Sequence, residues 1–398
     1  MNNFSPKFYA SSISYYSHLK FSHGEGCRCW TTDGSEYIDL ICGNGSVILG
    51  HAHSSVTQAV IRQLEKGSML PGPGPVFNKL RELLLDFYPH ADDILTFKTG
   101  SEAVAASIRL ARAYTKRNKI LRIGYHGWHD QVVSPHVRCH SYDESKFKKN
   151  WPPGVPHDKY ENLMLIWHGS NLHELLDLLH GENSDIAAVI IDPVQLRSSD
   201  FEEGIKLANA IHNIGALLIF DESKTGFRVD LGGVQSLYGL SADLTILNKA
   251  IANGLPLSVV LGRNDLITIA KPARIKGTFG LETAAIAAAV ATINILKSVD
   301  APKILNELGT YLIDGLNEVI QLSGLDSELL AVPYQWACMP YIHFRGDEES
   351  LQDKFYTNLL NQGVLMLHSH MSYVSLSMTK KDIDKVVISV QEVLTKLI

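Results

Sequence analysis

The sequence has few of the features that mark secreted or membrane-bound proteins. Five cysteines are scattered along 398 residues, at Cys27, Cys29, Cys42, Cys139 and Cys338. An odd, dispersed set of this kind indicates reduced thiols and not a disulfide framework. No apolar run reaches the length of about 18 residues that a membrane span needs, and the N-terminus lacks a charged region followed by an apolar stretch. We therefore expect a cytoplasmic protein with no membrane partner.

An excess of basic charge is also missing. Lys and Arg number 36 against 42 Asp and Glu, so the formal net charge is −6. Because no Lys/Arg cluster is interleaved with aromatic residues, nucleic acid is not an expected partner. The 45% of hydrophobic and 20% of charged residues are those of an ordinary enzyme, and the length suffices for one large or two medium cores.

Zinc-binding patterns are incomplete in this sequence. Cys27 and Cys29 form a Cys-x-Cys pair, but no second ligand pair of this kind accompanies it. His51 and His53 are close enough in sequence to share an ion, yet no glutamate-containing helical zinc motif includes them. The sequence therefore favours structural roles for these residues, and we expect no metal site.

Short apolar segments alternate with helical ones through the middle of the chain. This alternation predicts an α/β fold with a mostly parallel seven-stranded sheet and helices on both faces. The expected strands are residues 94–97, 119–123, 163–167, 187–191, 216–220, 244–247 and 257–261.

The two ends of the chain have a different texture. Residues 26–42 alternate around Asp33-Gly34 and predict a hairpin. Beyond about residue 300, two helical segments flank short strands at 340–344 and 373–376, as in a smaller α+β domain. We expect three parts, namely an N-terminal segment over residues 1–55 that packs with the small domain, a large domain over 56–295 and the small domain over 296–398.

Two polar residues follow apolar strands of the predicted sheet. Asp221 comes directly after residues 216–220, and Lys249 follows 244–247. Ligands bind at the carboxyl ends of strands in open α/β sheets. A lysine can hold pyridoxal 5′-phosphate (PLP) as a Schiff base, and a carboxylate can keep the pyridine nitrogen protonated. The alternative is that both are ordinary charges at strand ends.

The order of several further motifs decides between these alternatives. With Asp221 and Lys249, the chain resembles the class III, fold-type I PLP aminotransferases, in the branch that includes glutamate-1-semialdehyde aminomutase. The matching segments are DGSEYID at 33–39, LGHAH at 49–53, TGSEA at 99–103, IRLAR at 108–112, YHG at 125–127, DE at 221–222, TGFR at 225–228, Lys249, and GTFG at 277–280.

The resemblance implies roles for the residues at these positions. Lys249 is expected to hold PLP and to move a proton, while Asp221 faces the pyridine nitrogen. Tyr125 is expected to stack on the ring. From the residue alone, Tyr125 is equally a core aromatic. His126 and Ser223 are grouped with the cofactor-binding residues.

The phosphate of PLP is expected at the start of a long helix. Gly100 and Ser101 begin this helix, whose first N–H groups suit a phosphate. The resemblance also implies a homodimer with composite active sites, in which Thr278 reaches the phosphate of the neighbouring site. Without the resemblance, Ser101 is a simple helix cap and Thr278 a turn residue.

The chain departs from the family at positions near the expected site. Ser223 and Lys224 stand where relatives carry a β-branched apolar residue and then Gln or Met. Lys224 contacts the cofactor's 3′-oxygen or a substrate acid, or it points outward. Arg197 falls where relatives place residues that sort substrates, and its guanidinium suits a carboxylate or phosphate. The aminomutase's N-terminal arginine has no clear counterpart.

Three functions are compatible with these residues. The first is an aminotransferase that moves an amino group from a donor amine or amino acid, such as glutamate, to a carbonyl acceptor through a pyridoxamine phosphate form and a lysine-mediated proton shift. The second is an aminomutase or epimerase on the same scaffold. The third is a catalytically silent binding protein, against which the intact Lys249 and Asp221 argue.

Overall fold

The chain divides into two compact units. A computed structural model describes residues 16, 18–133, 153–156, 159, 163–167, 172–180, 185–195, 201–345, 349–368 and 370–397. One unit is Gln58–Ser298, and the other joins Met1–Thr57 to Val299–Ile398.

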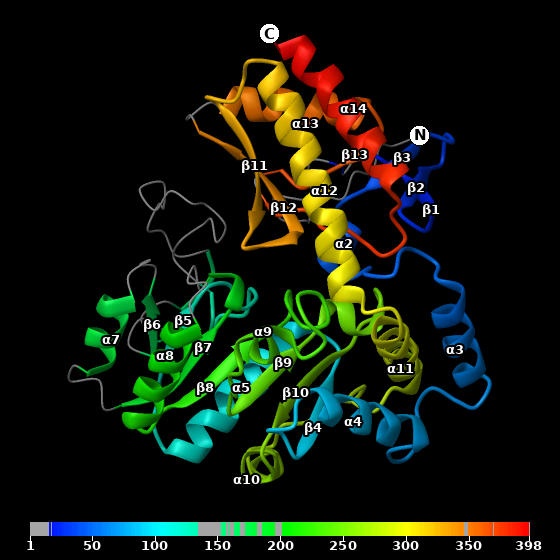
Figure 1. Ribbon diagram of the computed structural model, residues 1–398. Coiled ribbons are helices and arrows are strands. Elements are labelled where there is room, and N and C mark those ends of the chain that lie inside the picture. Colours follow the sequence, from blue (N-terminus) through cyan, green and yellow to red (C-terminus); the bar gives the residue numbers. More distant parts are fainter. Residues whose placement is uncertain are drawn as a thin grey trace. The chain divides into compact units, whose positions relative to one another are not determined.

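A seven-stranded sheet forms the centre of the unit Gln58–Ser298 (Figure 1). In spatial order, the strands are β4 (Asp93–Phe97), β10 (Ser258–Gly262), β9 (Leu244–Leu247), β8 (Leu217–Asp221), β7 (Ile186–Ile191), β5 (Lys119–Ile123) and β6 (Met164–Trp167). Neighbouring strands from β9 to β6 pair in parallel, whereas β10 is antiparallel to both of its neighbours. The predicted mostly parallel seven-stranded sheet is confirmed.

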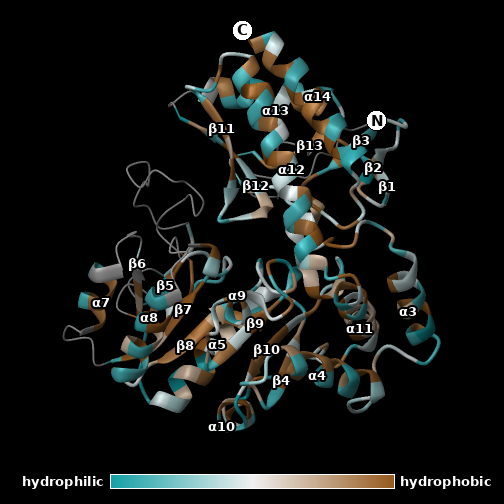
Figure 2. Cartoon of the chain, viewed as in Figure 1, coloured by the Kyte–Doolittle hydropathy of each residue, from teal (hydrophilic) through white to brown (hydrophobic). Residues whose placement is uncertain are grey.

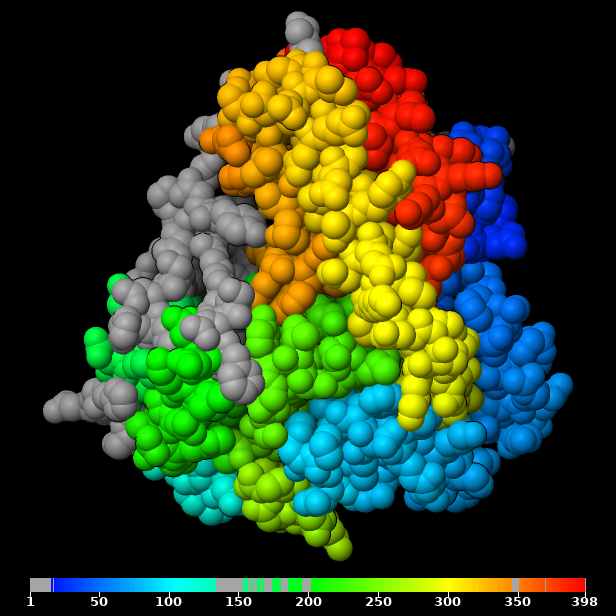
Figure 3. Space-filling model, in the orientation of Figure 1, coloured from blue at the N-terminus to red at the C-terminus, as the bar shows by residue number. Residues whose placement is uncertain are grey.

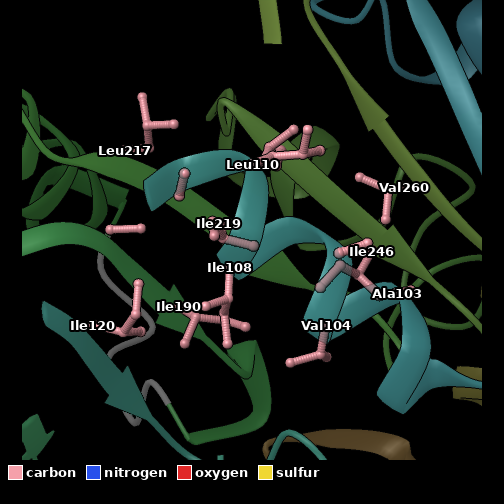
Figure 4. Packing of buried hydrophobic residues seen from close by; sticks show 14 of the residues in the cluster. Ala103, Val104, Ile108, Leu110, Ile120, Ile190, Leu217, Ile219, Ile246 and Val260 are labelled. Carbon is pink, nitrogen blue, oxygen red and sulfur yellow. The ribbon is translucent and has the colours of Figure 1, made fainter. Parts of the chain in front are cut away.

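Helices cover both faces of this sheet. On one face, α5 (Gly100–Thr115) directs Ala103, Val104, Ile108 and Leu110 toward strand residues such as Ile190 and Ile219 (Figure 4). On the other face, α7 (Leu172–His180) and α8 (Phe201–Asn213) pack against Val189, Leu218 and Phe220. Because successive strand residues point to opposite faces, a strand covered on both sides is apolar throughout. All six residues of β7 are accordingly buried.

Further helices complete this unit. They are α3 (Ser54–Leu64), which crosses the boundary between the units, α4 (Pro75–Phe87), α9 (Gly233–Tyr238), α10 (Asn264–Ile267) and α11 (Thr283–Ser298). Colouring by hydropathy shows that the strands are apolar, whereas helices such as α4 and α8 have one hydrophobic and one hydrophilic face (Figure 2). No single helix among the described residues is long and apolar enough to cross a membrane, and α11 and α12 (Ala301–Leu322) meet those criteria only when counted together.

The described residues of the unit formed by the chain's two ends contain two small sheets. One has the order β1 (Phe21–Glu25), β2 (Arg28–Thr31), β3 (Glu36–Asp39), β13 (Val364–Leu365), and the other pairs β11 (Leu329–Tyr334) with β12 (Trp336–Phe344). The helices are the short α2 (Cys42–Gly45), α12, α13 (Glu349–Asn361) and α14 (Lys380–Leu397). The side chains of α12 and α14 lie next to one another on the surface (Figure 3).

The hairpin and the C-terminal strand predicted for this unit have different outcomes. The predicted hairpin over residues 26–42 contains β2 and β3, and β1 extends it to three strands. The predicted strand at 373–376 is wrong. Its N–H groups bond to separate segments, since Tyr373 N–H donates to Leu40, Val374 to Cys338 and Leu376 to Ile48. It therefore has no continuous partner strand among the described residues.

Gly309 allows α12 to approach β12 closely. A Cβ at Gly309 would lie 1.9 Å from the carbonyl oxygen of Ala337, a backbone atom that cannot rotate away. At Gly315 of the same helix, a Cβ would lie 2.9 Å from a methyl group of Val387, which can move. The two glycines therefore differ in what a methyl group would displace.

We expect Gly309→Ala to lower the melting temperature and Gly315→Ala to change it little. Alanine in a helix interior is favoured over glycine by about 1 kcal/mol. Overpacking against a fixed backbone costs about 1–3 kcal/mol or more, so the balance is unfavourable only at Gly309. Thermal unfolding of both variants measures the difference, and a Gly309→Ala protein as stable as Gly315→Ala would contradict the close approach.

Candidate active site

Four parallel strands deliver polar residues to one edge of the large sheet. In the register of the strands, Ile123 pairs with Ile191, Ile191 with Phe220, and Asp221 with Ile246. The carboxyl ends of β5, β7, β8 and β9 are therefore neighbours (Figure 1). The residues that follow these ends are Tyr125 and His126, Asp192, Asp221 at the end of β8 itself, and Lys249.

Asp221 is a buried carboxylate with a hydrogen bond to each oxygen. Only 4% of the residue is exposed. His126 Nδ1 lies 2.9 Å from Oδ2, and Ser223 Oγ donates to Oδ1 at 2.5 Å. Burial raises the pKa of Asp221, but hydrogen bonds from His126 and Ser223 and the charges of His126 and Lys224 outweigh burial and hold the pKa below its ordinary value. Asp221 is thus ionised and fixed in orientation.

His126 acts through Asp221. Its ring is buried, and Nε2 lies 3.1 Å from the carbonyl oxygen of Ile123. Because a carbonyl oxygen and an ionised carboxylate both only accept, Nε2 donates to Ile123 and Nδ1 donates to Asp221. The sequence grouped His126 with the cofactor-binding residues but did not predict this contact.

Lys249 lies two residues beyond the end of β9, and its backbone is strained. Its φ of 50° lies in the left-handed region, where a residue with a side chain is disfavoured. Such strain is concentrated at functional sites. Burial and the positive charges of Lys224 and Arg228 lower the pKa of Lys249 to about 7, although Asp192 and Asp221 oppose the shift. The amine is therefore available in its neutral, nucleophilic form near neutral pH.

Lys224 points inward and forms an ion pair with Asp192. Its Nζ lies 2.5 Å from Asp192 Oδ2, and both residues are almost fully buried. The same ammonium is 5.8 Å from the centre of the Tyr125 ring. The sequence left the direction of Lys224 open, and the structure excludes the outward alternative. Asp192 follows β7 as Asp221 ends β8, so the same strand-end signal could have identified it.

The start of α5 packs tightly against the loops that carry the other residues. A Cβ at Gly100 would lie 2.4 Å from Asn248 Nδ2, and one at Gly127 would lie 2.4 Å from Ser101 Oγ. Thr99 caps the helix by accepting from the N–H of Glu102 at 3.2 Å, so Ser101 is not the N-cap. The first N–H groups of an α-helix and its dipole suit a phosphate.

Glu222 and Arg228 are buried residues that the sequence marked only as parts of motifs. Glu222 accepts from Thr225 and from the N–H groups of Val234 at 3.1 Å and Gln235 at 3.2 Å. Burial raises the pKa of Glu222 to about 7, although these hydrogen bonds oppose the shift. Glu222 thereby ties the loop after β8 to α9. Arg228 contributes positive charge near Lys249.

Two expected site residues are not brought to this cluster by contacts within the described chain. Thr278 is exposed in the loop before α11, and its neighbour Phe279 is 56% exposed. Arg197 lies outside the described residues. Both assignments remain predictions.

The arrangement fits PLP. Lys249 supplies a neutral amine, Asp221 a fixed carboxylate, and α5 a helix N-terminus held close by Gly100. A methyl group at Gly100 or Gly127 would fill the narrow space between these segments. Lys249 would hold the cofactor's aldehyde carbon, Asp221 would face its pyridine nitrogen, and the N-terminus of α5 would hold its phosphate.

Comparisons with known proteins agree on one family. The family model for aminotransferase class-III matches residues 10–394. A 3-aminobutyryl-CoA aminotransferase from Cloacimonas acidaminovorans (strain Evry) is 33% identical and covers 95% of this chain and 89% of its own. A glutamate-1-semialdehyde 2,1-aminomutase from Methanothrix thermoacetophila is 34% identical and covers 91% and 86%. The PLP internal aldimine form of FumI from Sphingopyxis sp. MTA144 superposes with a TM-score of 0.84, at 27% identity over 95% of this chain and 88% of that one.

Removing the Asp221 charge should nearly abolish amino-group removal from a donor. A charge pair at about 4 Å in an effective dielectric near 20 is worth roughly 4 kcal/mol, which corresponds to about three decades in rate. Asp221→Asn should therefore remain folded but react about a thousandfold more slowly in a single-turnover measurement. A loss of less than tenfold would contradict the role of Asp221.

His126→Phe tests the support of Asp221. Without the hydrogen bond, the pKa of Asp221 rises, so we expect activity to disappear at a higher pH as the solution is acidified. His129→Phe on the same loop is the control. An unchanged acid limb for His126→Phe would remove His126 from this role.

The low pKa of Lys249 predicts cofactor capture near neutral pH. At pH 8, an amine with a pKa of about 7 is about 90% neutral, whereas an ordinary lysine is less than about 1% neutral. We expect the rate of PLP capture by the apoprotein, followed by absorbance, to rise with a midpoint near pH 7. Lys224→Met should raise this midpoint, because a nearby positive charge is lost.

A second variant distinguishes the loss of a charge from misfolding in this test. Lys224→Met alone leaves Asp192 buried without its ion-pair partner, which is strongly destabilising. The double variant Lys224→Met/Asp192→Asn removes both charges and should show a smaller rise. The exposed Lys297→Met is a control for loss of a lysine. A lower midpoint in Lys224→Met would contradict the electrostatic coupling.

Proposed function

The chain belongs to the class III aminotransferase family, and we propose that it transfers an amino group from a donor amine or amino acid to a carbonyl acceptor with PLP. The observation that carries the proposal is the pairing of two strand-end residues, the fixed carboxylate of Asp221 and the neutral amine of Lys249. Amino transfer needs both.

PLP supplies an electron sink that stabilises negative charge at the substrate's Cα. In the proposed mechanism, Asp221 keeps the proton on the pyridine nitrogen, and His126 keeps Asp221 oriented. The Lys249 amine would be the base that moves the proton between the substrate's Cα and the cofactor. Tyr125 would support the ring, and the N-terminus of α5 at Gly100 and Ser101 would hold the phosphate.

Lys224 and Ser223 adapt the site in this chain. Ser223 supports Asp221 through its hydroxyl group, a polar contact that an aliphatic side chain cannot make. Lys224, paired with Asp192, adds a positive charge that lowers the pKa of Lys249. We propose that this charge also attracts an acidic group of the substrate.

The second candidate is an aminomutase, which several curated relatives are named for. It uses the same aspartate and lysine but retains its intermediate and releases no keto product. The missing N-terminal arginine favours the aminotransferase. Arg197 is then proposed to bind an acidic group of the donor or acceptor, on the basis of the sequence alone.

We propose a homodimer with composite sites. The support for this proposal is that Thr278 and the neighbouring Phe279, which is 56% exposed, are both accessible on the loop before α11. In such a dimer, Thr278 reaches the phosphate in the partner's site. Sedimentation at the mass of one chain, 44.0 kDa, would contradict the proposal.

A screen of amino donors tests the function. Donors such as glutamate should bleach the visible band of the lysine-bound cofactor and release a keto product in stoichiometric amount. An aminomutase would consume an amino aldehyde or similar substrate without releasing a keto product. A colourless protein that no donor alters after incubation with PLP would support a silent binding protein, and Lys249→Ala serves as the blank.

Arg197→Ala in the same screen tests the substrate class. Loss of a charge-assisted hydrogen bond costs about 1.5–3 kcal/mol, or roughly ten- to a hundredfold in kcat/KM. We expect this loss for acidic substrates only, with the cofactor spectrum unchanged. Equal kcat/KM for both proteins across all acidic substrates would remove Arg197 from the site.

A further inference from the structure

Three side chains with metal-binding atoms meet in the unit formed by the chain's two ends. Cys29 Sγ lies 3.3 Å from His51 Nε2, and the same nitrogen lies 2.8 Å from Asp39 Oδ2. The sulfur and this carboxylate oxygen are 4.0 Å apart. One ligand atom each from the thiol, the imidazole and the carboxylate thus lie within 4.8 Å of one another. None of the three belongs to the residues around Lys249.

The backbone brings these three side chains together. In the β2–β3 pair, Cys29 is opposite Tyr37, so Asp39, two residues further on, projects from the same face. His51 is attached to Gly26 by two backbone hydrogen bonds, of 3.0 and 2.7 Å. Strand pairing therefore fixes all three positions.

The side chains are also held in orientation. Asp39 Oδ1 accepts from the N–H groups of Ile41 at 2.7 Å and Cys42 at 3.1 Å, which turns Oδ2 toward His51. A Cβ at Gly24 would lie 2.8 Å from the His51 ring, so the imidazole rests directly on the backbone of β1. Support of this kind orients metal ligands before the metal arrives.

We propose that Cys29, Asp39 and His51 bind a zinc-like divalent cation. Zinc takes sulfur, nitrogen and oxygen ligands in tetrahedral geometry, and three protein ligands leave a fourth position for water. The ligand atoms of such a site are about 3.6 Å (S to N), 3.4 Å (N to O) and 3.6 Å (S to O) apart. The observed 3.3, 2.8 and 4.0 Å differ from these by about 0.3 to 0.6 Å, a distance that small side-chain rotations cover.

Binding exchanges protons for the cation. The thiol of Cys29 and the His51 Nε2–H group, which faces Asp39, each release a proton to solvent, and the neutral imidazole keeps its proton on Nδ1. Asp39 contributes a carboxylate that needs no change. The mixed S, N and O donors favour zinc over magnesium or calcium, which prefer oxygen alone.

Zinc chloride added to the chelator-treated, full-length holoenzyme tests the proposal. We expect one equivalent to bind by calorimetry, and zinc to protect Cys29 from alkylation in a peptide map. Cys29→Val and His51→Asn should each weaken binding by more than about a hundredfold, because even outer-shell changes cost 10–100-fold. X-ray absorption at the zinc edge should show one sulfur ligand.

Cys27→Ser is the matched control. Cys27 lies two residues from Cys29 in sequence, but it is buried, and its sulfur faces the Arg28 guanidinium. Zinc binding by this variant should equal that of the wild type. Equal binding by Cys29→Val, or alkylation of Cys29 that zinc does not slow, would overturn the proposal and leave a hydrogen-bonded cluster only. Circular dichroism verifies that each variant is folded.

Discussion

The parallel pairing of β5, β7, β8 and β9 is the constraint on which the active site depends. Parallel strands all end at one edge, and a shift of one residue would turn every side chain to the opposite face. The pairing of Asp221 with Ile246 therefore fixes the position of Lys249 relative to Asp221. The apolar residues on both faces of β7 and β8 hold that register, so the packing of the core positions the groups proposed for catalysis.

Charges buried at this edge are acceptable only because each has a partner. The carboxylate of Asp221 has His126 and Ser223, and that of Asp192 has Lys224. Isolated buried charges would be costly. Hydrogen bonds and neighbouring charges keep Asp221 ionised despite its burial, whereas burial and the positive charges of Lys224 and Arg228 favour the neutral form of Lys249. The same burial thus has opposite consequences for the two residues, and the difference lies in their neighbours.

The sequence predicts those site residues whose position depends on a local pattern. Asp221 and Lys249 each follow an apolar run, and that signal was enough to bring them to one edge. The contact of His126 with Asp221 spans 95 residues, and no spacing encodes it. Cys29 and His51 meet through strand pairing, although the sequence favoured structural roles for both. The strand predicted at 373–376 is wrong because an apolar segment can bond to several separate partners in turn.

The left-handed backbone of Lys249 has a consequence for how this protein can change over time. A residue held at φ 50° costs about 1–3 kcal/mol unless it is glycine. Exchange for glycine would relieve that cost and would remove the amine with it. Selection for stability and selection for chemistry therefore act in opposite directions at this single position. A more stable descendant with glycine there would keep the fold and lose the amine that the proposed amino transfer requires.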